Sequence, residues 1–398
     1  MALKHTPIPL AIVGGGAAGL FAASVAAGRA LPSLVFERKA RLGTKLLMTA
    51  NGRCNFTRDL SPEAMAQDLG DPVGPWVLPA LEACPPSLIA GGFRALGVKL
   101  RRMDDGRLFP ASGEARTIVH AFGDFLRDEG VPLCTNCPVT GIQPMKNGFL
   151  VAAGFFTVWA EKVLVATGGL SFPKTGSVGD GFRMARETGH TVEPCRAGLI
   201  GYETADPQAV RRAGERIADS CARVLDKNGA PLFEASGEVA CETWGVGGAA
   251  VYNCSRYVAR HPPAGGWTLE VRFGDGPVLR LASPAPRPIQ EAIVTIGGVS
   301  LSDVNPATME SRKLPGLYFA GEVLDIDGPT GGYNITLAFA TARLAVESVC
   351  DARGMPPSRP APRASGRPRG GKTQKPRPRR PRRDSRGRGN HPDPGEIP

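Results

Sequence analysis

The sequence predicts an α/β fold in which a parallel sheet forms early in the chain and a small β-rich domain is inserted later. The first observation is an apolar run of strand length at 8–13, followed by a stretch of helical composition at 17–30 and a second apolar run at 33–37. This order is typical of a β-α-β unit. The second observation is an apolar run at 162–169 that ends in glycines. The third is the change at 196–290 to many Gly and Pro residues and short alternating stretches, which favour strands.

These patterns divide the chain into four parts. We expect a nucleotide-binding domain whose first part is 1–195 and whose second part is 291–351, with a β-rich substrate domain inserted at 196–290. Residues 352–398 form a tail. With 398 residues, 42% of them hydrophobic, the chain is long enough to bury a large core, which excludes a wholly disordered protein.

Further elements belong to the nucleotide-binding domain. A β-rich tract with period-two stretches covers 131–161 and leads into the apolar strand that ends in glycines. After the insertion, residues 316–328 are expected to form a strand that runs into a loop, and 335–350 a final helix. Both ends of the chain therefore contribute to one α/β domain.

The positive charge of the chain is concentrated in the tail. The formal net charge is +11, and residues 351–398 hold 14 Lys and Arg against 4 Asp and Glu. Because the tail has almost no apolar residues, it cannot bury enough surface to offset the entropy lost on ordering, and we expect 352–398 to be disordered. Its Arg- and Gly-rich segment at 376–389 is suited to contact RNA phosphates, although solvation alone is an alternative interpretation.

The cysteines and the apolar N-terminal stretch indicate a soluble cytoplasmic protein. Nine cysteines are scattered without regular spacing, which favours a reducing compartment over a disulfide framework. Cys134 and Cys137 have the spacing of a redox dithiol or of half a zinc site, but no second pair follows, and we expect no metal. Residues 8–36 are nearly free of charge, yet glycines and Pro32 interrupt the run, so we expect neither a signal peptide nor a membrane span.

Gly14, Gly16 and Gly19 form a GxGxxG pattern between the first strand and the first helix. The first glycine permits a tight turn, the second lets a pyrophosphate approach the backbone, and the third lets helix and strand pack closely. The phosphates then lie at the helix N-terminus. Glu37 follows Gly19 by 18 residues, at the end of the second strand, where a carboxylate accepts hydrogen bonds from ribose hydroxyls and repels a 2′-phosphate. The pattern predicts FAD or NAD rather than NADP.

Two further glycine-rich strand ends favour FAD over NAD. Residues 166–169 close an apolar strand, and 321–334 couple a strand end to a helix start. In such a fold Glu322 or Asp325 can hydrogen-bond the ribityl chain, and the backbone N–H groups of 331–334 can face the flavin pyrimidine edge, where negative charge develops on reduction. No second GxGxxG follows a strand and precedes a helix. NAD(P)H, where it is the electron donor, would therefore dock transiently at the flavin face.

The segment GTKLLMTANGRCNFT at 43–57 resembles the signature GxKLLxSGGGRCNxT of a bacterial family, the BaiN-like, RdsA-like or aminoacetone-oxidase-like flavoproteins. The similarity continues through 106–122, 167–190 and 296–334, and it covers most of 8–350. The resemblance implies a Rossmann-like FAD-binding domain of the two-dinucleotide-binding-domain flavoprotein type with a β-rich insertion. It agrees with the fold that the residues predict on their own.

The pattern and the resemblance together predict an FAD site built from both ends of the chain. Ala50 and Asn51 replace glycines of the signature, so the loop beside the flavin is expected to differ, and the insertion is short and lacks the helical part common in the family. The expected cofactor-binding residues are Gly14, Gly16, Ala17, Ala18, Gly19, Glu37, Arg38, Gly43, Lys45, Leu46, Asn51, Gly52, Arg53, Cys54, Asn55, Ala166, Thr167, Gly168, Gly169, Gly321, Glu322, Asp325, Gly331, Gly332, Tyr333 and Asn334.

Cys54 is the candidate catalytic residue. The adjacent Arg53 favours a thiolate, and a thiol near a flavin can act as an acid. A small buried cysteine without a catalytic role is the alternative interpretation. Lys45 and Arg53 are expected to neutralise the pyrophosphate or the reduced flavin, whereas His120 and His190 are interpreted as structural.

An FAD-dependent oxidoreductase is the function that these observations predict. Members of the family that the chain resembles reduce uridine to dihydrouridine in ribosomal RNA, oxidise aminoacetone, or reduce unsaturated bile-acid intermediates. We therefore expect an NAD(P)H-linked reductase of a C=C bond, with uridine in ribosomal RNA as one candidate substrate. Two alternatives stay open: an amine oxidase that acts on a small molecule with oxygen, and a noncatalytic RNA-binding flavoprotein that uses its tail. The sequence leaves the oligomeric state undetermined.

Overall fold

The β-α-β unit lies at the start of the computed structural model, which describes residues 7–356. Strand β1 (Ile8–Val13) leads through the glycine turn into helix α1 (Ala17–Gly28) and on to strand β2 (Ser33–Phe36). The two strands are parallel. Most of β1 is fully buried, because a parallel strand is covered on both faces, and this explains its unbroken apolar sequence. The predicted α/β class is confirmed.

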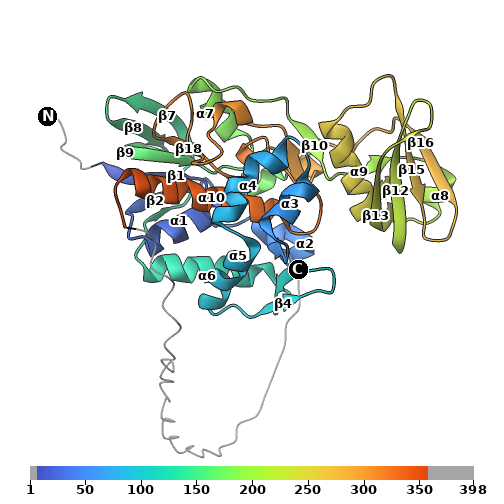
Figure 1. The fold of residues 1–398 in the computed structure, drawn as a ribbon, viewed down its shortest axis with the longest axis horizontal. Coiled ribbons are helices and arrows are strands. Elements are labelled where there is room, and N and C mark those ends of the chain that lie inside the picture. Colours follow the sequence, from blue (N-terminus) through green and yellow to red (C-terminus); the bar gives the residue numbers. More distant parts are fainter. Residues whose placement is uncertain (1–6, 357–398) are drawn as a thin grey trace, which may run out of the picture. The chain divides into compact units, whose positions relative to one another are not determined.

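Seven strands form the main sheet, in the order β6-β2-β1-β9-β8-β7, with β18 also paired to β9 (Figure 1). The other strands are β6 (Leu133–Cys134), β7 (Val139–Met145), β8 (Gly148–Ala153), β9 (Phe156–Val165) and β18 (Leu317–Phe319). The pairs among β6, β2, β1, β9 and β18 are parallel, whereas β7 and β8 form an antiparallel hairpin that β9 extends. The segments that follow β1, β2, β9 and β18 therefore meet at one edge of the sheet, where ligands bind in doubly wound folds.

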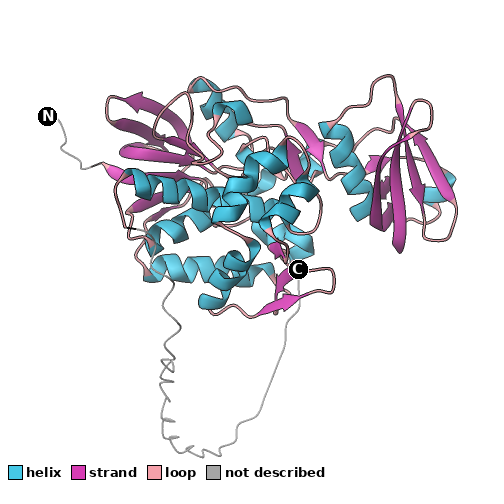
Figure 2. Ribbon diagram, in the orientation of Figure 1, coloured by secondary structure: helices cyan, strands magenta, loops and turns pink. Residues whose placement is uncertain are grey.

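Helices pack beside this sheet, as Figure 2 shows in cyan and magenta, and aromatic side chains join them. Helix α1 packs against the last helix, α10 (Tyr333–Ala352), and Phe21 stacks on Phe339 with ring centroids 4.6 Å apart. Helix α5 (Pro86–Ala95) contributes Phe93 and helix α6 (Ala115–Asp128) contributes Phe122, with ring centroids 5.3 Å apart. Such aromatic pairs bury large areas and fix the helices against one another.

Residues 49–110 contain elements that the sequence patterns did not predict. These elements are helices α2 (Thr49–Gly52), α3 (Pro62–Leu69), α4 (Val73–Ala83) and α5, and a three-stranded antiparallel sheet of β3 (Thr57–Arg58), β5 (Arg107–Pro110) and β4 (Leu100–Arg102). The start of α3 carries a capping signal, because the Ser61 side chain accepts a hydrogen bond from Ala64 N and Pro62 occupies the first turn. Helix α7 (Asp180–Glu187) follows the glycine-rich end of β9.

Residues 196–296 form a second sheet with its own apolar core. Six antiparallel strands are ordered β11-β14-β13-β12-β15-β16. Their bounds are β11 (Tyr202–Glu203), β12 (Arg216–Asp226), β13 (Pro231–Glu242), β14 (Gly245–Gly247), β15 (Trp267–Arg272) and β16 (Val278–Ala282). A separate ladder of β10 (Arg196–Gly198) and β17 (Val294–Ile296) joins the entry and exit of this segment. Domain boundaries at 196 and 290 stay a proposal.

The expectation of an insertion without a sustained helix is wrong. Helix α9 (Ala249–Arg260) packs against β12 and β13, and a short helix α8 (Pro207–Val210) contacts β13 and β14. Ala250, Val251 and Cys254 are fully buried, at a spacing that matches one face of a helix. The sequence contains this helical spacing of apolar residues, but the glycines at 245–248 directly before it favour a turn or strand interpretation.

The C-terminal tail lies largely beyond the described part of the chain. Helix α10 ends at Ala352, and the expectation of a disordered, RNA-contacting segment at 352–398 falls outside the described residues except for 352–356. Within residues 7–356, no helix is both long and apolar enough to cross a membrane.

Candidate functional site

The glycine turn after β1 brings the N-terminus of α1 to the edge of the main sheet. Gly14 has φ +110°, and a Cβ there would lie 2.5 Å from Ala166 O, so the turn and the end of β9 touch. A Cβ on Gly19 would lie 1.8 Å from Gly14 O. Around Gly16, by contrast, a Cβ would meet nothing within 4 Å. No side chain caps α1 and its first turn has no acidic residue, which leaves its N–H groups available to an anion.

Glu37 lies directly beneath this turn. Its Oε2 accepts a hydrogen bond from Gly15 N at 2.8 Å, and its Oε1 accepts one from Lys39 N at 2.7 Å. The residue is 9% exposed. An ionised carboxylate has about four acceptor positions, so Glu37 keeps capacity for further donors such as hydroxyls. The neighbouring Arg38 pairs with Asp180, Nη1 to Oδ2, at 2.7 Å.

A cavity of about 570 Å³ runs along the sheet edge from this turn. It is lined by most of the residues expected from the sequence, which come from both ends of the chain. These lining residues are Gly14, Gly16, Ala17, Ala18, Glu37, Arg38, Lys45, Leu46, Asn51, Arg53, Asn55, Ala166, Thr167, Gly168, Gly321, Glu322, Gly331, Gly332 and Asn334. The strand ends of β1, β9 and β18 thus open into one space.

Seven expected residues do not line the cavity. They are Gly19, Gly43, Gly52, Cys54, Gly169, Asp325 and Tyr333. Several have other contacts: a Cβ on Gly169 would lie 2.3 Å from Thr295 Oγ1, and Tyr333 Oη donates to Asp68 Oδ2 at 2.5 Å. Between the two carboxylates proposed for the ribityl chain, Glu322 faces the cavity and Asp325 pairs with Arg260, Oδ1 to Nη1, at 2.7 Å.

Lys45 and Glu322 form an ion pair in the cavity wall. Lys45 Nζ lies 2.5 Å from Glu322 Oε2 and donates to Ser171 Oγ at 2.6 Å. The other carboxylate oxygen of Glu322 accepts from Ser171 Oγ at 3.0 Å and from Thr295 N at 2.9 Å. The charge of Lys45 is therefore already balanced within the protein. Arg53 has no such partner among the described residues and donates its Nε to Ala50 O at 3.1 Å.

Ala50 and Asn51 adopt a backbone conformation that favours glycine. Their φ and ψ are 49° and 45° for Ala50, and 55° and 45° for Asn51. Both lie in the left-handed region, which costs an alanine about 1 kcal/mol and is tolerated better by asparagine. The expectation that these replacements change the loop relative to the family stays a prediction. Both residues line the cavity.

Cys54 is buried in the apolar core, away from the cavity. Its side chain is 0% exposed, and burial raises the pKa of the thiol to about 12, against a smaller lowering by a hydrogen bond with Thr49. The sequence argument for a thiolate beside Arg53 therefore runs against the environment of the sulfur, because desolvation outweighs the neighbouring charge. Cys54 has no role in the function proposed below.

The rate of alkylation should show whether Cys54 is a buried neutral thiol or a thiolate stabilised by Arg53. With a pKa of about 12, only about one thiol in ten thousand is ionised near pH 8, so iodoacetamide should label Cys54 far more slowly than the partly exposed Cys134. Peptide mass spectrometry of the native protein over a range of pH measures both rates. Labelling of Cys54 that already rises steeply near neutral pH would show a stabilised thiolate and restore the catalytic interpretation.

The other candidate side chains from the sequence lie outside the cavity lining, apart from Cys137. His190 is 4% exposed and its Nε2 lies 2.6 Å from Ser311 Oγ, while burial lowers the pKa of its imidazole. His120 is exposed on α6. Cys137 lines the cavity near Glu37, and burial raises the pKa of its thiol to about 12, with Cys134 adding to the effect. A neutral buried thiol does not suit a redox dithiol or a metal ligand.

The inserted segment, which the sequence predicts to be a substrate domain, also lines the cavity, through residues that the sequence patterns did not name. Arg216 on β12, Glu238 on β13 and Tyr252 on α9 all line it. Arg216 Nη1 and Glu238 Oε1 are paired at 2.7 Å. Tyr252 is half-buried, and burial raises the pKa of its hydroxyl above the ordinary value. The helical period of 249–260 is the only sequence signal that could have placed Tyr252 near the site.

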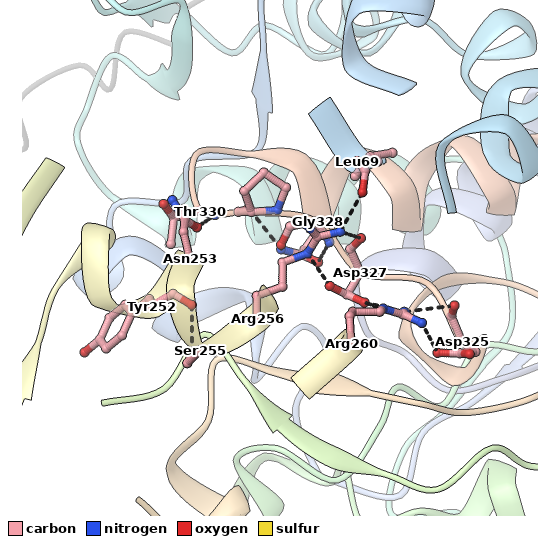
Figure 3. Close-up of polar contacts among 12 residues, drawn as sticks. Leu69, Tyr252, Asn253, Ser255, Arg256, Arg260, Asp325, Asp327, Gly328 and Thr330 are labelled. Carbon is pink, nitrogen blue, oxygen red and sulfur yellow. Dashed lines mark hydrogen bonds and ion pairs between the residues drawn. The ribbon is translucent and has the colours of Figure 1, made fainter. Parts of the chain in front are cut away.

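Ion pairs and hydrogen bonds connect helix α9 to the loop that follows β18 (Figure 3). Arg256 Nε donates to Asp327 Oδ2 at 2.5 Å, and Arg260 Nε donates to Asp327 Oδ1 at 2.6 Å. Asn253 Oδ1 accepts from Thr330 N at 2.9 Å. Asp327 is 0% exposed. The same helix therefore presents Tyr252 to the cavity and holds the loop after β18, which also lines the cavity.

The cavity fits a flavin nucleotide on three observations of this structure. The uncapped N-terminus of α1 with open space at Gly16 suits a pyrophosphate. The carboxylate of Glu37 suits a ribose. The N-terminus of α10 at Gly332, which lines the cavity, has no side-chain cap and suits the negative charge that develops at a flavin pyrimidine edge.

The fold and this site define an FAD-dependent oxidoreductase with a Rossmann-like cofactor domain. The chain belongs to the HI0933-like family, because the family profile of the HI0933-like protein Rossmann domain matches residues 8–348. This match and the relatives that follow confirm the resemblance found in the sequence.

The relatives of known activity cover most of the chain. One is a 3-dehydro-bile acid delta(4,6)-reductase of Clostridium scindens, which is 27% identical over 84% of this chain and 97% of that protein. Another is a ribosomal RNA dihydrouridine synthase of Escherichia coli, 27% identical over 83% of this chain and 95% of that protein. Among solved structures, a 3-ketosteroid delta1-dehydrogenase from Sterolibacterium denitrificans has a TM-score of 0.54 at 13% identity, covering 86% of this chain and 99% of that one. This last likeness shows the fold alone.

Proposed function

We propose that this protein reduces a C=C bond with electrons from NAD(P)H, and that uridine in ribosomal RNA is its substrate. One observation carries the proposal: Arg216, Glu238 and Tyr252 of the inserted segment line the same cavity as the expected cofactor residues, so a substrate that contacts them would lie beside the cofactor. The two relatives support it, since one is named a delta(4,6)-reductase and the other a dihydrouridine synthase. Such a substrate implies a cytoplasmic enzyme.

The lining residues suggest how FAD would be held. The N–H groups at the start of α1, around Gly16, would bind the pyrophosphate, and Glu37 would accept the ribose hydroxyls. Glu322, fixed by Lys45, would receive the ribityl chain. The backbone around Gly332, at the start of α10, would face the pyrimidine edge, where a helix N-terminus stabilises negative charge.

Saturation of a C=C bond needs a hydride and a proton on adjacent carbons. Bound FAD would supply the hydride chemistry. We assign the proton to Tyr252, which lines the cavity and whose hydroxyl is protonated at neutral pH already at the ordinary pKa of a tyrosine and more so at its raised pKa. Burial is the largest cause of that raised pKa, because it disfavours the phenolate. The proton held at Tyr252 Oη can be replaced from solvent after each turnover.

One arginine of the cavity favours this function over amine oxidation. Arg53 lines the cavity without a carboxylate partner among the described residues, and its charge would repel a cationic amine. Carbonyl oxygens and phosphates, which a pyrimidine nucleotide carries, are instead attracted by guanidinium groups. The cavity therefore suits an electron-rich or anionic substrate.

Anaerobic absorbance measurements test the proposal. NADPH should bleach the flavin of the full-length holoenzyme, and unmodified ribosomal RNA should then restore the flavin spectrum and gain dihydrouridine. In Tyr252→Phe, bleaching by NADPH should be unchanged, whereas the RNA-dependent reoxidation should slow by about 100-fold, within the usual contribution of a general acid. Stopped-flow spectroscopy and nucleoside analysis measure the two steps.

Three results would count against the proposal. Bleaching by aminoacetone with release of peroxide would indicate an amine oxidase, and binding of RNA without flavin reduction by any donor would indicate a noncatalytic protein. An equal loss of both half-reactions in Tyr252→Phe would show a structural effect rather than proton delivery. Tyr257→Phe is the matched control, because Tyr257 lies on the same helix but does not line the cavity.

A further inference from the structure

Arg53 and Arg107 line the cavity, and Arg58 lies beside Arg107 near the start of α10. Arg53 follows α2, Arg58 lies on β3 and Arg107 lies on β5. The β3–β5 register sets Arg58 directly opposite Arg107. The guanidinium carbons of Arg53 and Arg107 lie 5.5 Å and 5.9 Å from the centroid of the Phe109 ring. The small antiparallel sheet therefore brings together charges that are far apart in the sequence.

Gly331 is the point where this arginine cluster meets the cavity. A Cβ on Gly331 would lie 3.0 Å from Arg58 Nη1 and 3.9 Å from Arg107 Cδ. Gly331 itself lines the cavity, with φ +112°. Because Gly331 has no side chain, there is room between the cavity and the Arg58 guanidinium. The guanidinium carbon of Arg58 is also held over the Tyr333 ring, 5.9 Å from the centroid.

The cluster has fewer acidic partners than positive charges. Arg107 pairs with Asp105, Nε to Oδ2, at 2.6 Å. Partial burial raises the pKa of Asp105, but hydrogen bonds and charge from Arg107, together with the charge of Arg58, hold that pKa below its usual value. Within residues 7–356, Arg53 and Arg58 form no ion pair with any carboxylate. Three neighbouring guanidinium groups thus share one carboxylate, and a bound anion would relieve their repulsion.

We propose that Arg53, Arg58 and Arg107 form a binding subsite for a phosphate ester at the mouth of the cavity. The planar fork of a guanidinium matches two phosphate oxygens, and the hydrogen bonds it makes are charge-assisted. The subsite itself follows from the charges, and only the source of the phosphate rests on the function proposed above. Two sources share this chemistry: the phosphates of NAD(P)H and the phosphodiester backbone of a single-stranded RNA.

Direct binding to the full-length holoenzyme tests the subsite. Isothermal titration calorimetry should give the dissociation constants of NADPH and of a short uridine-containing RNA oligonucleotide. In Arg58→Gln, one of the two constants should rise by about tenfold, because one charge-assisted phosphate contact is lost. Arg58→Lys keeps the charge without the fork and should give a smaller rise. When RNA is the ligand, the salt dependence of its binding should also fall by about 0.7 in the log–log slope.

Arg102→Gln is the matched control. Arg102 is exposed on the neighbouring strand β4, and its position opposite Leu108 puts it on the other face of the small sheet from Arg58 and Arg107. This substitution removes the same charge from the same sheet, and binding should be unchanged in it. Equal weakening by Arg102→Gln and Arg58→Gln would indicate a diffuse positive field and overturn the subsite. Unchanged constants for both ligands in Arg58→Gln, with flavin content and melting temperature intact, would overturn it as well.

Comparison of NADPH and RNA binding identifies the source of the phosphate. The result for the subsite is also separable from the result for the proposed function. A rise only for NADPH places the donor phosphate in the subsite, and a rise only for RNA places the substrate backbone there. Competition of both by inorganic pyrophosphate, lost in Arg58→Gln, supports the subsite even when NADPH fails to bleach the flavin. Reduction of RNA by the wild type together with unaltered binding in Arg58→Gln would remove the subsite and leave the proposed function standing.

Discussion

Replacement of Asp327 by alanine is expected to destabilise the protein by about 3 to 5 kcal/mol, the cost of leaving buried charge without its partner. Asp327 is fully buried between Arg256 and Arg260, whose side chains are only 13% and 10% exposed. Arg256 also donates to Leu69 O at 2.9 Å, so three segments meet at this carboxylate. Urea unfolding of the apoprotein and holoprotein, followed by circular dichroism, measures the effect.

The same substitution should also disturb the cavity. Helix α9 would lose the two side-chain contacts to Asp327. It would keep the ion pair of Arg260 with Asp325 and the hydrogen bond between Asn253 and Thr330. Asp327→Asn, which keeps the shape but removes the charge, should fall between alanine and the wild type. Asp124→Ala is the control, because Asp124 and Arg127 form an exposed pair, 67% and 72% exposed, of the kind that contributes little. Similar midpoints for Asp327→Ala and Asp124→Ala would contradict the argument.

The cofactor half of the site could be predicted because its requirements are local. A tight turn, a close approach of the backbone and an open helix N-terminus each demand a glycine at a fixed offset, and Gly14, Gly16 and Gly19 meet these demands within six residues. The position of Glu37 beside the glycine turn could also be predicted, because β2 is the next strand in the sequence and pairs in parallel with β1. Parallel strand ends share one edge, so the glycines after β9 and β18 could also be expected there.

The substrate half could not be predicted, because its residues meet only through tertiary contacts. Tyr252 and Arg216 belong to different elements of the inserted segment and face the cavity only once α9 packs on its sheet. The same helix reaches Asp327 across 71 residues from Arg256. Arg58 and Arg107 become neighbours through a two-residue strand, which is too short to leave a periodic signal.

The prediction of a thiolate at Cys54 is wrong because it used only the neighbouring residue in the sequence and not the tertiary environment of the thiol. The adjacent Arg53 in the sequence suggested a stabilised thiolate, but the two side chains diverge. Arg53 is exposed and lines the cavity, whereas Cys54 is fully buried. A charge next in sequence therefore has little influence compared with desolvation by the core. Burial determines the pKa of the Cys54 thiol, and burial cannot be inferred from the residue that is next in the sequence.

Gly16→Ser is expected to raise the dissociation constant of FAD by about 100-fold while the apoprotein stays folded. A Cβ at Gly16 meets no protein atom within 4 Å, so the substitution fills only the space that opens into the cavity. A serine hydroxyl at this N-cap position can also accept a hydrogen bond from an N–H group of α1, which the pyrophosphate would otherwise use. Fluorescence titration of the apoprotein with FAD measures the affinity, and the melting temperature of the apoprotein reports its stability.

Two other glycines of α1 separate loss of the cofactor from loss of the fold. A Cβ on Gly19 would lie 1.8 Å from Gly14 O, so Gly19→Ala should force helix and strand apart and lower the melting temperature of the apoprotein as well as FAD affinity. Gly28 ends the same helix, where a Cβ would meet nothing within 4 Å, and it does not line the cavity, so Gly28→Ala should leave FAD affinity unchanged. Wild-type affinity in Gly16→Ser would place the pyrophosphate elsewhere, because a side chain at that position cannot share the space with it.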